Sequence, residues 1–338
     1  MDIPAKTGYL GIDVGSVSTN LVIIDEHADV LASIYRRTQG QPIKAVQEGL
    51  QELTDLLDDQ EIEVRAVGAT GSARHLTGII VGADVIKNEI TAHAVAASQV
   101  VPDVSTVLEI GGQDSKLIIL RDGVVTDFAM NSVCAAGTGS FLDHQSTRLG
   151  IPIEDFGGYA QRSESPAHIA GRCSVFAESD MIHKQQVGVN IDDIIYGLCH
   201  ALVRNYINNL GKGKDLESPI VFQGGVAANA GMKRAFEDAI GQEVVVPAHY
   251  NVMGAIGSAI LAMELELEPG ETGFKGFEVT GLSYETSTFG CNGCSNTCEV
   301  VRIKVGGKTL ARWGGRCGKW ENEDAPAKRK KERAAARV

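Results

Sequence analysis

The sequence predicts an α/β protein with two related α/β domains and a small cysteine-rich module near its C-terminal end. A strand–turn–strand pattern begins at Tyr9 and returns at Val107, and such a repeat indicates two similar domains that face each other. The length of 338 residues agrees, because a chain of this size exceeds one ordinary hydrophobic core. Four cysteines between Cys291 and Cys317 surround an alternating segment, which predicts a separate hairpin module.

The composition excludes several classes of protein. A net charge of -12 argues against a nucleic-acid surface, so we expect no nucleic-acid partner. No apolar run reaches the roughly 18 residues that a membrane-spanning helix needs, and we expect no membrane association. Residues 1–6 lack the charged and apolar regions of a signal peptide, which favours the cytoplasm. In that compartment seven cysteines indicate metal or redox chemistry rather than disulfides.

The first strand–turn–strand segment, residues 9–25, has the composition of a phosphate-binding turn. Glycine lets backbone N–H groups approach phosphate oxygens, and serine hydroxyls add further donors. An acidic residue at the end of the strand can hold Mg²⁺ directly or through water. The residues of these kinds are Gly11, Asp13, Gly15, Ser16 and Ser18. One such turn is weak evidence, because an ordinary β-turn has the same composition.

Residues 107–120 repeat the pattern, with Gly111 and Gly112 at the turn and Gln113 and Asp114 directly after them. Two turns of this kind strengthen the interpretation that both domains contact the same phosphates.

A third segment, residues 218–229, reads as an apolar strand that runs into Gly224 and Gly225 and then into a helix near Asn229. A double glycine can present backbone to an adenosine, although a plain strand–helix junction is the alternative. Residues 252–260 read as a helix with small residues, which allow another helix or backbone to approach closely.

Two single cysteines stand at corresponding places, each after a loop-like stretch and before a run of helical character. Cys134 begins the sequence Cys-Ala-Ala-Gly-Thr-Gly, and Cys173 begins Cys-Ser-Val-Phe-Ala-Glu. The partial positive charge of a helix N-terminus favours a thiolate. A [4Fe-4S] cluster normally takes four thiolates, so two per chain suggest a cluster shared across the two-fold axis of a homodimer. Two buried structural cysteines are the alternative on spacing alone.

The C-terminal cysteines have the spacing of a metal site. Cys291, Cys294, Cys298 and Cys317 follow the pattern C-x2-C-x3-C-x18-C around an alternating segment. This set suits Zn²⁺ or a second [4Fe-4S] cluster, and the sequence does not choose between them. A zinc-stapled hairpin without a redox role is the structural alternative. Residues 321–338, at the end of the chain, read as a flexible tail.

Taken in order, these segments resemble the actin–sugar kinase–Hsp70 superfamily of ATPases. Residues 11–18 match its first phosphate segment, residues 109–116 its second, and residues 222–229 its adenosine segment. The resemblance covers residues 7–268. It implies two actin/Hsp70-like (ribonuclease H-like) ATPase domains that flank a nucleotide cleft.

We expect the following boundaries from this resemblance: ATPase domain I at 7–104 with 252–268, ATPase domain II with the two single cysteines at 105–251, and the cysteine-rich metal-binding module at 277–320.

Within the superfamily, the single-cysteine segments resemble the activators of 2-hydroxyacyl-CoA dehydratases, a branch that includes ATPase subunits of benzoyl-CoA reductase. Its CAAGTG and C-x-VFAESE/D segments are present almost unaltered at 134–139 and 173–180. The resemblance implies a homodimer in which Cys134 and Cys173 ligate one bridging [4Fe-4S] cluster. ATP hydrolysis would drive one electron from a ferredoxin or flavodoxin-like donor onto an iron–sulfur dehydratase or reductase partner.

The same resemblance implies roles for the phosphate-binding segments. Asp13 would help to hold Mg²⁺ through water, and Gln113 and Asp114 would orient water or metal. The glycines and serines would cradle the phosphates of ATP or lie along its nucleoside. The residues expected to bind the nucleotide are Gly11, Gly15, Ser16, Ser18, Gly111, Gly112, Gly224, Gly225 and Asn229.

Two other functions fit the superfamily. A small-molecule, sugar-type kinase would need a substrate base in the cleft and no metal-binding cysteines. A chaperone-like or structural ATPase would use its cysteines only for zinc. Three further residues favour structural interpretations: His93 as a satisfied buried histidine, Glu178 as a helix cap or subunit contact, and Cys199 as part of the core. The sequence does not name the partner or its substrate.

Overall fold

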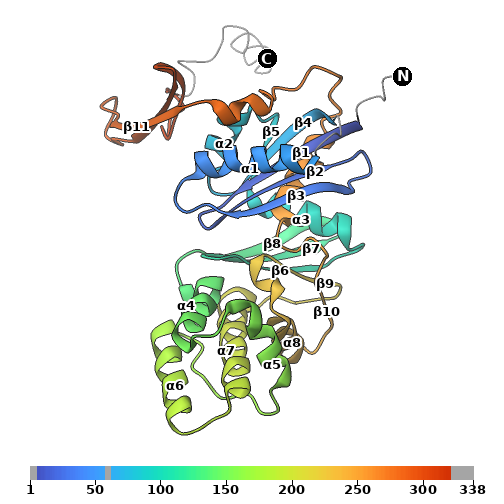
Figure 1. Ribbon diagram of the computed structural model, residues 1–338, viewed down its shortest axis with the longest axis vertical. Coiled ribbons are helices and arrows are strands. Elements are labelled where there is room, and N and C mark those ends of the chain that lie inside the picture. The colour runs from blue at the N-terminus through green and yellow to red at the C-terminus, as the bar shows by residue number, and fades with distance from the viewer. Residues whose placement is uncertain (1–5, 58–61, 321–338) are drawn as a thin grey trace.

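Two five-stranded sheets and a third sheet of three strands organise the chain (Figure 1). The computed structural model describes residues 6–57 and 62–320. The predicted flexible tail at 321–338 lies outside the described residues. So do residues 1–5, which belong to the N-terminal segment without signal-peptide features. The predicted fold class, with two related α/β domains and a small C-terminal module, is confirmed.

The first sheet has the strand order β3-β2-β1-β4-β5. Its strands are β1 (Lys6–Val14), β2 (Ser18–Ile24), β3 (Val30–Arg37), β4 (Ile62–Thr70) and β5 (Val85–Ile86). The first three strands are antiparallel, whereas β4 pairs parallel with β1 and β5 with β4. Successive residues of β2 point to opposite faces, so Leu21 and Ile23 enter one core and Val22 and Ile24 another.

The second sheet repeats this arrangement position for position, in the order β8-β7-β6-β9-β10. Its strands are β6 (Thr106–Ile110), β7 (Ser115–Arg121), β8 (Val124–Asn131), β9 (Ile220–Gln223) and β10 (Val244–Val245). Antiparallel and parallel pairs occur at the same places as in the first sheet. The strand–turn–strand repeat of the sequence is therefore β1–β2 and β6–β7, and the exact domain boundaries stay a prediction.

Two helices pack between the sheets and form a core that both domains share. They are α3 (Glu89–Val100) and α9 (Met253–Met263). This core receives Val22 and Ile24 from the first sheet, and Val107 and Ile118 from the second. The placement of α3 between the sheets is visible in Figure 1. The relative position of the two domains thus depends on these helices.

The outer faces of the sheets are covered by the remaining helices. Those on the first sheet are α1 (Pro42–Leu57) and α2 (Arg74–Val81). Those on the second are α4 (Gly139–Leu149), α5 (Phe156–Arg162), α6 (Ser174–Gln186), α7 (Ile191–Tyr206) and α8 (Ala230–Ile240). Short 3₁₀ helices are η1 (Ala135–Gly137), η2 (Ile153–Asp155), η4 (Gly225–Ala228) and η5 (Phe277–Gly281), and η3 (Ile207–Gly211) is a π-helical turn. Cys199 on α7 is fully buried, which confirms its predicted place in the core.

Small residues let α9 lie against its neighbours at backbone contact distance. A Cβ atom on Gly257 would come within 1.8 Å of the carbonyl oxygen of Ala92 on α3. One on Gly68 of β4 would come within 1.9 Å of the carbonyl oxygen of Ser258. The predicted close approach to this helix is confirmed, and it fixes how deeply α9 enters the shared core.

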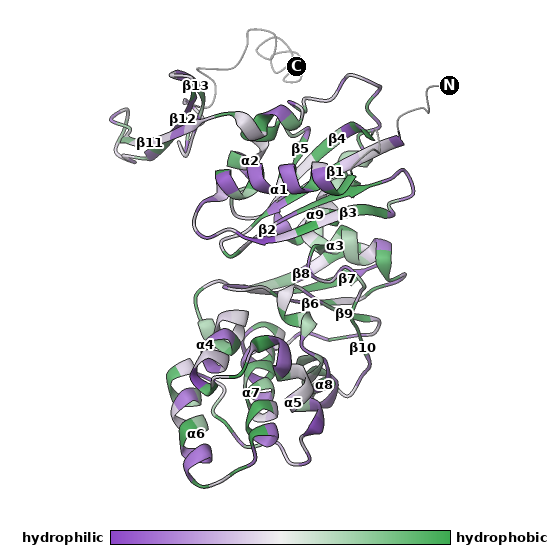
Figure 2. Cartoon of the chain, viewed as in Figure 1, coloured by the Kyte–Doolittle hydropathy of each residue, from purple (hydrophilic) through white to green (hydrophobic). Residues whose placement is uncertain are grey.

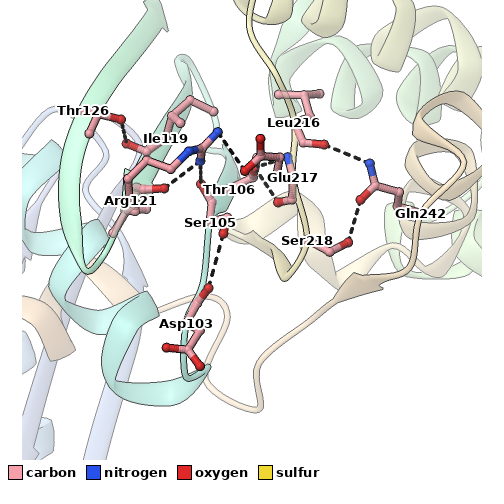
Figure 3. Close-up of polar contacts among 11 residues, drawn as sticks. Asp103, Ser105, Thr106, Ile119, Arg121, Thr126, Leu216, Glu217, Ser218 and Gln242 are labelled. Carbon is pink, nitrogen blue, oxygen red and sulfur yellow. Dashed lines mark hydrogen bonds and ion pairs between the residues drawn. The ribbon is translucent and has the colours of Figure 1, made fainter.

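A polar network holds the second sheet together at the end remote from the turn between β6 and β7 (Figure 3). The hydroxyl of Thr106 donates to the carbonyl oxygen of Glu217 at 2.9 Å, and the Glu217 carboxylate pairs with Arg121 at 3.1 Å. Gln242 donates to Leu216 at 2.9 Å. The segment before β9 is thereby tied to β6, to β7 and to the loop after α8.

The third sheet, β11-β12-β13, has one strand more than the predicted hairpin. Its antiparallel strands are β11 (Tyr284–Gly290), β12 (Glu299–Val305) and β13 (Lys308–Trp313). Ile303 is fully buried in the core of domain I. On α1, the Gln47 amide donates to the carbonyl oxygens of Val279, Thr280 and Leu282 at 2.8–3.1 Å, which anchors the chain just before this sheet.

Hydropathy follows the layers of the fold (Figure 2). The strands of the two large sheets carry long hydrophobic stretches, whereas α1 also presents hydrophilic residues. Within the described part of the chain, none of the helices combines the length and the apolar character needed to cross a bilayer.

The contact between α9 and α3 yields a first prediction. Gly257→Ala should lower the free energy of unfolding by about 1–3 kcal/mol, the usual cost of overpacking, although alanine is the better helix former. Urea denaturation measures this. Gly281→Ala is the matched control, because a Cβ atom there meets nothing within 4 Å and the change should stay within about 0.5 kcal/mol. Equal stability of both variants would contradict the predicted close packing.

Candidate nucleotide cleft and cysteine sites

A cleft between the two domains gathers most of the residues predicted to bind ATP. Its walls come from the turn after β1, the turn between β6 and β7, and the double glycine after β9. The predicted residues that line it are Asp13, Gly15, Ser16, Ser18, Gly111, Gly112, Gln113, Asp114, Gly224 and Gly225. Their individual roles stay predictions, but segments more than 200 residues apart in sequence meet in one cavity.

Each of the two phosphate-type turns is closed by the same kind of backbone hydrogen bond. The N–H of Gly15 donates to the carbonyl oxygen of Ser18 at 2.8 Å, and the N–H of Gly111 donates to that of Asp114 at 3.0 Å. The third wall needs glycine for a steric reason. Gly224 has φ +89, and a Cβ atom there would lie 2.4 Å from the carbonyl oxygen of Ile110.

A second cavity continues the cleft toward α4 and α8 and is more apolar. It shares Val17, Gly112 and Gly225 with the cleft, and its other lining residues include Leu142, Ile153, Val226 and Asn229. Asn229 caps α8, because its Oδ1 accepts the N–H of Gly231 at 2.9 Å. Its Nδ2 is buried without a partner among the described residues. The two joined cavities thus have a polar end that suits phosphates and an apolar end, with one unsatisfied hydrogen-bond donor, that suits a nucleoside.

Gly11 is the predicted nucleotide-binding residue that the structure places elsewhere. It does not line either cavity and instead lies beneath α9, where a Cβ atom would come within 1.9 Å of the carbonyl oxygen of Ala255. The glycine therefore serves the packing of β1 on α9.

Lys116 on β7 is a buried cation at the floor of the cleft. Its ammonium lies 2.9 Å from Glu109, 3.1 Å from Asp114 and 3.5 Å from Glu89. Burial would lower the pKa of Lys116, but the carboxylates of Glu109, Asp114 and Glu89 raise it above its usual range. The ammonium thus stays charged. Its pair with Glu89 joins the second sheet to α3.

Burial acts on the pKa values of two carboxyl groups beside this cation. Burial, followed by the nearby charge of Glu89, raises the pKa of Asp13 to about 7. Burial also acts to raise the pKa of Glu109, but the ammonium of Lys116 at 2.9 Å opposes this effect and favours the ionised carboxylate in the pair. The floor of the cleft therefore holds a proton on Asp13 near neutral pH that a metal ion could displace.

His93 on α3 is satisfied inside the protein, as predicted. Its Nδ1 lies 2.9 Å from Nε2 of Gln223 on β9. Burial, with a smaller contribution from Lys116, lowers the pKa of His93 to about 3, so the ring is neutral. This hydrogen bond is a second polar link from α3 to the second sheet.

Sequence reasoning assigned no site role to Lys116, Glu89 or Glu109. One signal was present, because a lysine within the apolar strand Ser115–Arg121 must either reach solvent or find carboxylates. The identity of those carboxylates was not visible, since Glu89 belongs to a helix from another part of the chain.

The two single cysteines begin neighbouring helical segments in domain II. Cys173 is the N-cap of α6, and Cys134 precedes one 3₁₀ turn, η1, after which α4 begins at Gly139. Both cysteine residues are partly exposed. The predicted helical run after Cys134 thus consists of a 3₁₀ turn followed by α4, and the hydroxyl of Thr138 donates to the carbonyl oxygen of Ala135 at 2.9 Å between them.

Two asparagines hold the cysteine loops against the end of α7. The side chain of Asn131 accepts a hydrogen bond from the N–H of Cys134 at 2.9 Å and donates one to the carbonyl oxygen of Cys134 at 2.8 Å. Asn205 donates to the carbonyl oxygen of Gly171, two residues before Cys173, at 2.7 Å. Both amides border Gly137, where a Cβ atom would meet each of them within 3.1 Å. The two loops are thereby brought together in one face of domain II.

Large apolar side chains beside these cysteines are exposed. Val133 is 95% exposed, and Val175 and Phe176 are each 67% exposed. We call these three residues the apolar rim. Exposed hydrophobic residues grouped at one place are typical of an interaction surface.

Glu178 on α6 contacts α4 of the same chain. Its carboxylate lies 3.3 Å from the guanidinium of Arg148 and 3.5 Å from the ring of His144. The predicted helix cap is not formed, since Glu178 lies in the second turn of α6.

The four C-terminal cysteines lie at one end of the third sheet. Cys291, Cys294 and Cys298 belong to the loop from β11 to β12, and Cys317 follows the end of β13. The N–H of Cys291 donates to the carbonyl oxygen of Cys298 at 2.8 Å. Across residues 6–57 and 62–320, no three His, Cys, Asp or Glu side chains converge closely enough to hold a metal ion. The four-thiolate site stays a prediction.

The fold and the cleft define an ATPase of the two-domain actin/Hsp70-like class. A family model, the BadF/BadG/BcrA/BcrD ATPase family, matches residues 10–262. The chain belongs to this family. The third sheet and its cysteines follow the matched region.

Known relatives agree with this assignment. The chain is 35% identical over 260 residues to the (R)-2-hydroxyglutaryl-CoA dehydratase activating ATPase of Acidaminococcus fermentans, covering 75% of this chain and 96% of that protein. It is 32% identical over 258 residues to the 2-hydroxyisocaproyl-CoA dehydratase activator of Clostridioides difficile, covering 75% and 94%. The crystal structure of an activator of 2-hydroxyisocaproyl-CoA dehydratase from Clostridium difficile with bound ADPNP matches with a TM-score of 0.71 at 29% identity, over 76% of this chain and 95% of that one.

The raised pKa of Asp13 predicts how stability depends on pH. Between the ordinary pKa of 3.8 and about 7, the folded protein holds a proton that the unfolded chain has released. This contribution to stability is therefore lost as pH rises through that window. Without Mg²⁺, Asp13→Asn should show a smaller decrease in melting temperature between pH 5 and pH 8 than the wild type. Asp55→Asn, at an exposed site on α1, is the control. Parallel pH profiles for all three proteins would contradict the assignment.

Proposed function

We propose that this protein is an ATP-driven activator that passes one low-potential electron to an iron–sulfur dehydratase of 2-hydroxyacyl-CoA or to a related iron–sulfur partner. Membership in an ATPase family supports the use of ATP. Relatives that activate dehydratases of different 2-hydroxyacyl-CoA compounds support the class of partner. A ferredoxin or flavodoxin-like protein would supply the electron.

The placement of Cys134 and Cys173 carries this proposal. Two partly exposed cysteines at the starts of helical segments are brought to one face by Asn131 and Asn205. Backbone N–H groups at a helix start favour negative charge, which suits thiolates and a cluster bound to them. A [4Fe-4S] cluster held there by two copies of the chain would supply the one-electron chemistry.

The apolar rim supports a homodimer at this face. Val133 directly precedes Cys134, and Val175 and Phe176 follow Cys173 by two and three residues. In a symmetric dimer the same surface of both copies would be covered, and the rim would exclude water around the four thiolates.

Different residues of the cleft would contact the phosphates, the nucleoside and the Mg²⁺ ion. Backbone N–H groups of the Gly15 and Gly111 turns would face phosphates, and Asn229 would meet the nucleoside with its unsatisfied amide. Asp13 would hold Mg²⁺ through water, with phosphate oxygens and water completing the shell. Gln113 and Asp114 would orient the attacking water.

Iron content tests the cluster. Anaerobically purified wild type should contain about two irons and two sulfides per subunit, since four thiolates from two chains hold one cluster. Cys134→Ala should lose the iron and sulfide, whereas Cys199→Ala should keep both, because Cys199 on α7 is buried in the hydrophobic core. About six irons per subunit would place a second cluster in the C-terminal group, and zinc would identify that group as structural. No iron after anaerobic reconstitution would contradict electron transfer and favour the sugar-type kinase.

The apolar rim gives a separate test of the dimer. Phe176→Glu should shift the protein toward monomers and lower its iron content, because a carboxylate would be buried without a partner at the interface. Binding of MgATP should change little. Leu56→Glu, at a 59% exposed site on α1, is the control and should remain dimeric. Sedimentation velocity measures the association, and an unchanged dimer of Phe176→Glu would argue against this face.

A further inference from the structure

The C-terminal part of the chain is positively charged, whereas the rest of the protein is acidic. Residues 284–338 contain 12 lysines and arginines against 6 aspartates and glutamates, which gives a net charge of +6. Residues 1–283 contain 19 lysines and arginines against 37 aspartates and glutamates, which gives -18. The third sheet, with the segment up to Trp320, has 6 against 2. This sheet is therefore a basic module attached to an acidic body.

Three cations of the third sheet lie on the face that points away from domain I. Successive residues of a strand point to opposite faces, and Ile303 of β12 enters the core of domain I. Its neighbours Arg302 and Lys304 therefore point outward. Arg312 of β13 is the register partner of Arg302 and lies on the same side. These three residues are partly exposed, and we call this side of the sheet the outward face.

Aromatic rings hold the cations at one end of the outward face. The guanidinium of Arg302 lies 5.6 Å from the centre of the Phe289 ring on β11, and that of Arg312 lies 5.7 Å from the indole of Trp320. The ammonium of Lys319 is 5.0 Å from the same indole. The rings of Phe289 and Trp320 also pack on each other, with centroids 5.0 Å apart. Cations stacked on rings lose little freedom on binding, so the face is pre-organised for negative charge.

The positive charge of the outward face is not balanced within the sheet. Glu285 is the register partner of Lys304, but neither Lys304 nor Lys319 forms an ion pair with a residue that the structure describes. Arg302 and Arg312 stand directly opposite each other, and like charges at opposed positions destabilise a sheet. Such a local cost is expected at a functional surface, where an anionic partner supplies the missing charge.

The spread of these cations distinguishes between classes of anion. Lys304 lies two residues from Arg302, or about 7 Å along β12. Arg312 belongs to the next strand, and Lys319 lies beyond the end of that strand. One phosphate group cannot meet all four, whereas a protein can present several carboxylates at once. A long nucleic acid would extend past the sheet onto the acidic body, whose negative charge would repel it.

We propose that the outward face of the third sheet is a docking surface for an acidic protein. Its contact residues are Arg302, Lys304, Arg312 and Lys319. Guanidinium groups on this face would pair with carboxylates of the partner, and such charge-assisted hydrogen bonds are among the stronger polar contacts. The third sheet lies beyond domain I, at the opposite end of the molecule from α6 (Figure 1). The surface is thus separate from the apolar rim, and docking here needs neither a cluster nor a nucleotide.

Binding of a carboxylate-bearing polypeptide tests this surface. Fluorescently labelled poly-L-glutamate is titrated with the full-length protein, and its anisotropy is measured at about 50 mM and about 200 mM salt. The wild type should bind the probe, and more weakly at the higher salt concentration. Lys304→Gln with Lys319→Gln should weaken binding by about fivefold or more. Adding Arg302→Gln and Arg312→Gln should abolish it.

A matched variant separates the outward face from the charge of the whole protein. Lys184→Gln with Lys212→Gln removes the same charge from two lysines of domain II that also lack ion pairs within the described part of the chain. This control should keep the wild-type affinity. Thermal melting and binding of MgATP should match the wild type in both double variants. Lys319→Gln alone serves if the double variant of the sheet does not fold, because Lys319 lies outside the strands.

The inference is overturned if the wild type does not bind poly-L-glutamate at the lower salt concentration, or if the sheet variant and its control bind it equally well. A short DNA duplex is titrated in parallel. Tighter binding of the duplex than of poly-L-glutamate would identify a nucleic-acid surface and would also overturn the inference. A protein without iron would contradict the proposed function alone, since these titrations do not depend on the cluster.

Discussion

The buried ammonium of Lys116 is the interaction on which the nucleotide cleft depends. Glu109, Asp114 and Glu89 lie around it within 3.5 Å, and without this cation the buried carboxylate of Glu109 would face two partly exposed carboxylates with no opposite charge. An uncompensated buried charge costs several kcal/mol. The cation also joins the domains, since Glu89 belongs to α3 and Lys116 to β7. The charge balance of the cleft and the position of α3 are therefore maintained together.

The shared core constrains the same elements by packing. Helix α9 approaches β1, β4 and α3 so closely that Gly11, Gly68 and Gly257 leave no room for a Cβ atom. The hydrogen bond from Gln223 to His93 adds a polar link across this core. Helix α9 packs on the first sheet, α3 contacts the second, and the two helices pack on each other, so the domains are joined by packed elements.

Much of the cleft could be predicted because its chemistry is local. Turns such as the one from Gly111 to Asp114 carry their glycines and polar residues within a few positions, so their pattern is readable in one segment. Their repetition also revealed the two domains. Lys116 could not be assigned in this way, because its partners lie in other segments and depend on the register that places it opposite Glu109.

Other features depended equally on distant contacts. Gly11 belongs by its local pattern to a phosphate turn, yet its role is set by α9, which is more than 240 residues away. The strand β11 escaped prediction because its residues are mostly polar and give no hydrophobic alternation. The link from Asn205 to the loop of Cys173 joins residues 34 apart and leaves no local sequence signal.

The position of the shared core has a kinematic consequence. Helices α3 and α9 lie between the two large sheets, so a rotation of one domain against the other would turn about this shared core. The third sheet lies beyond domain I, and α6 lies on the outer side of domain II (Figure 1). In any such rotation the displacement would grow with distance from the axis. The C-terminal cysteines and Cys173 lie on opposite sides of the shared core, so both would be displaced more than the residues of the cleft.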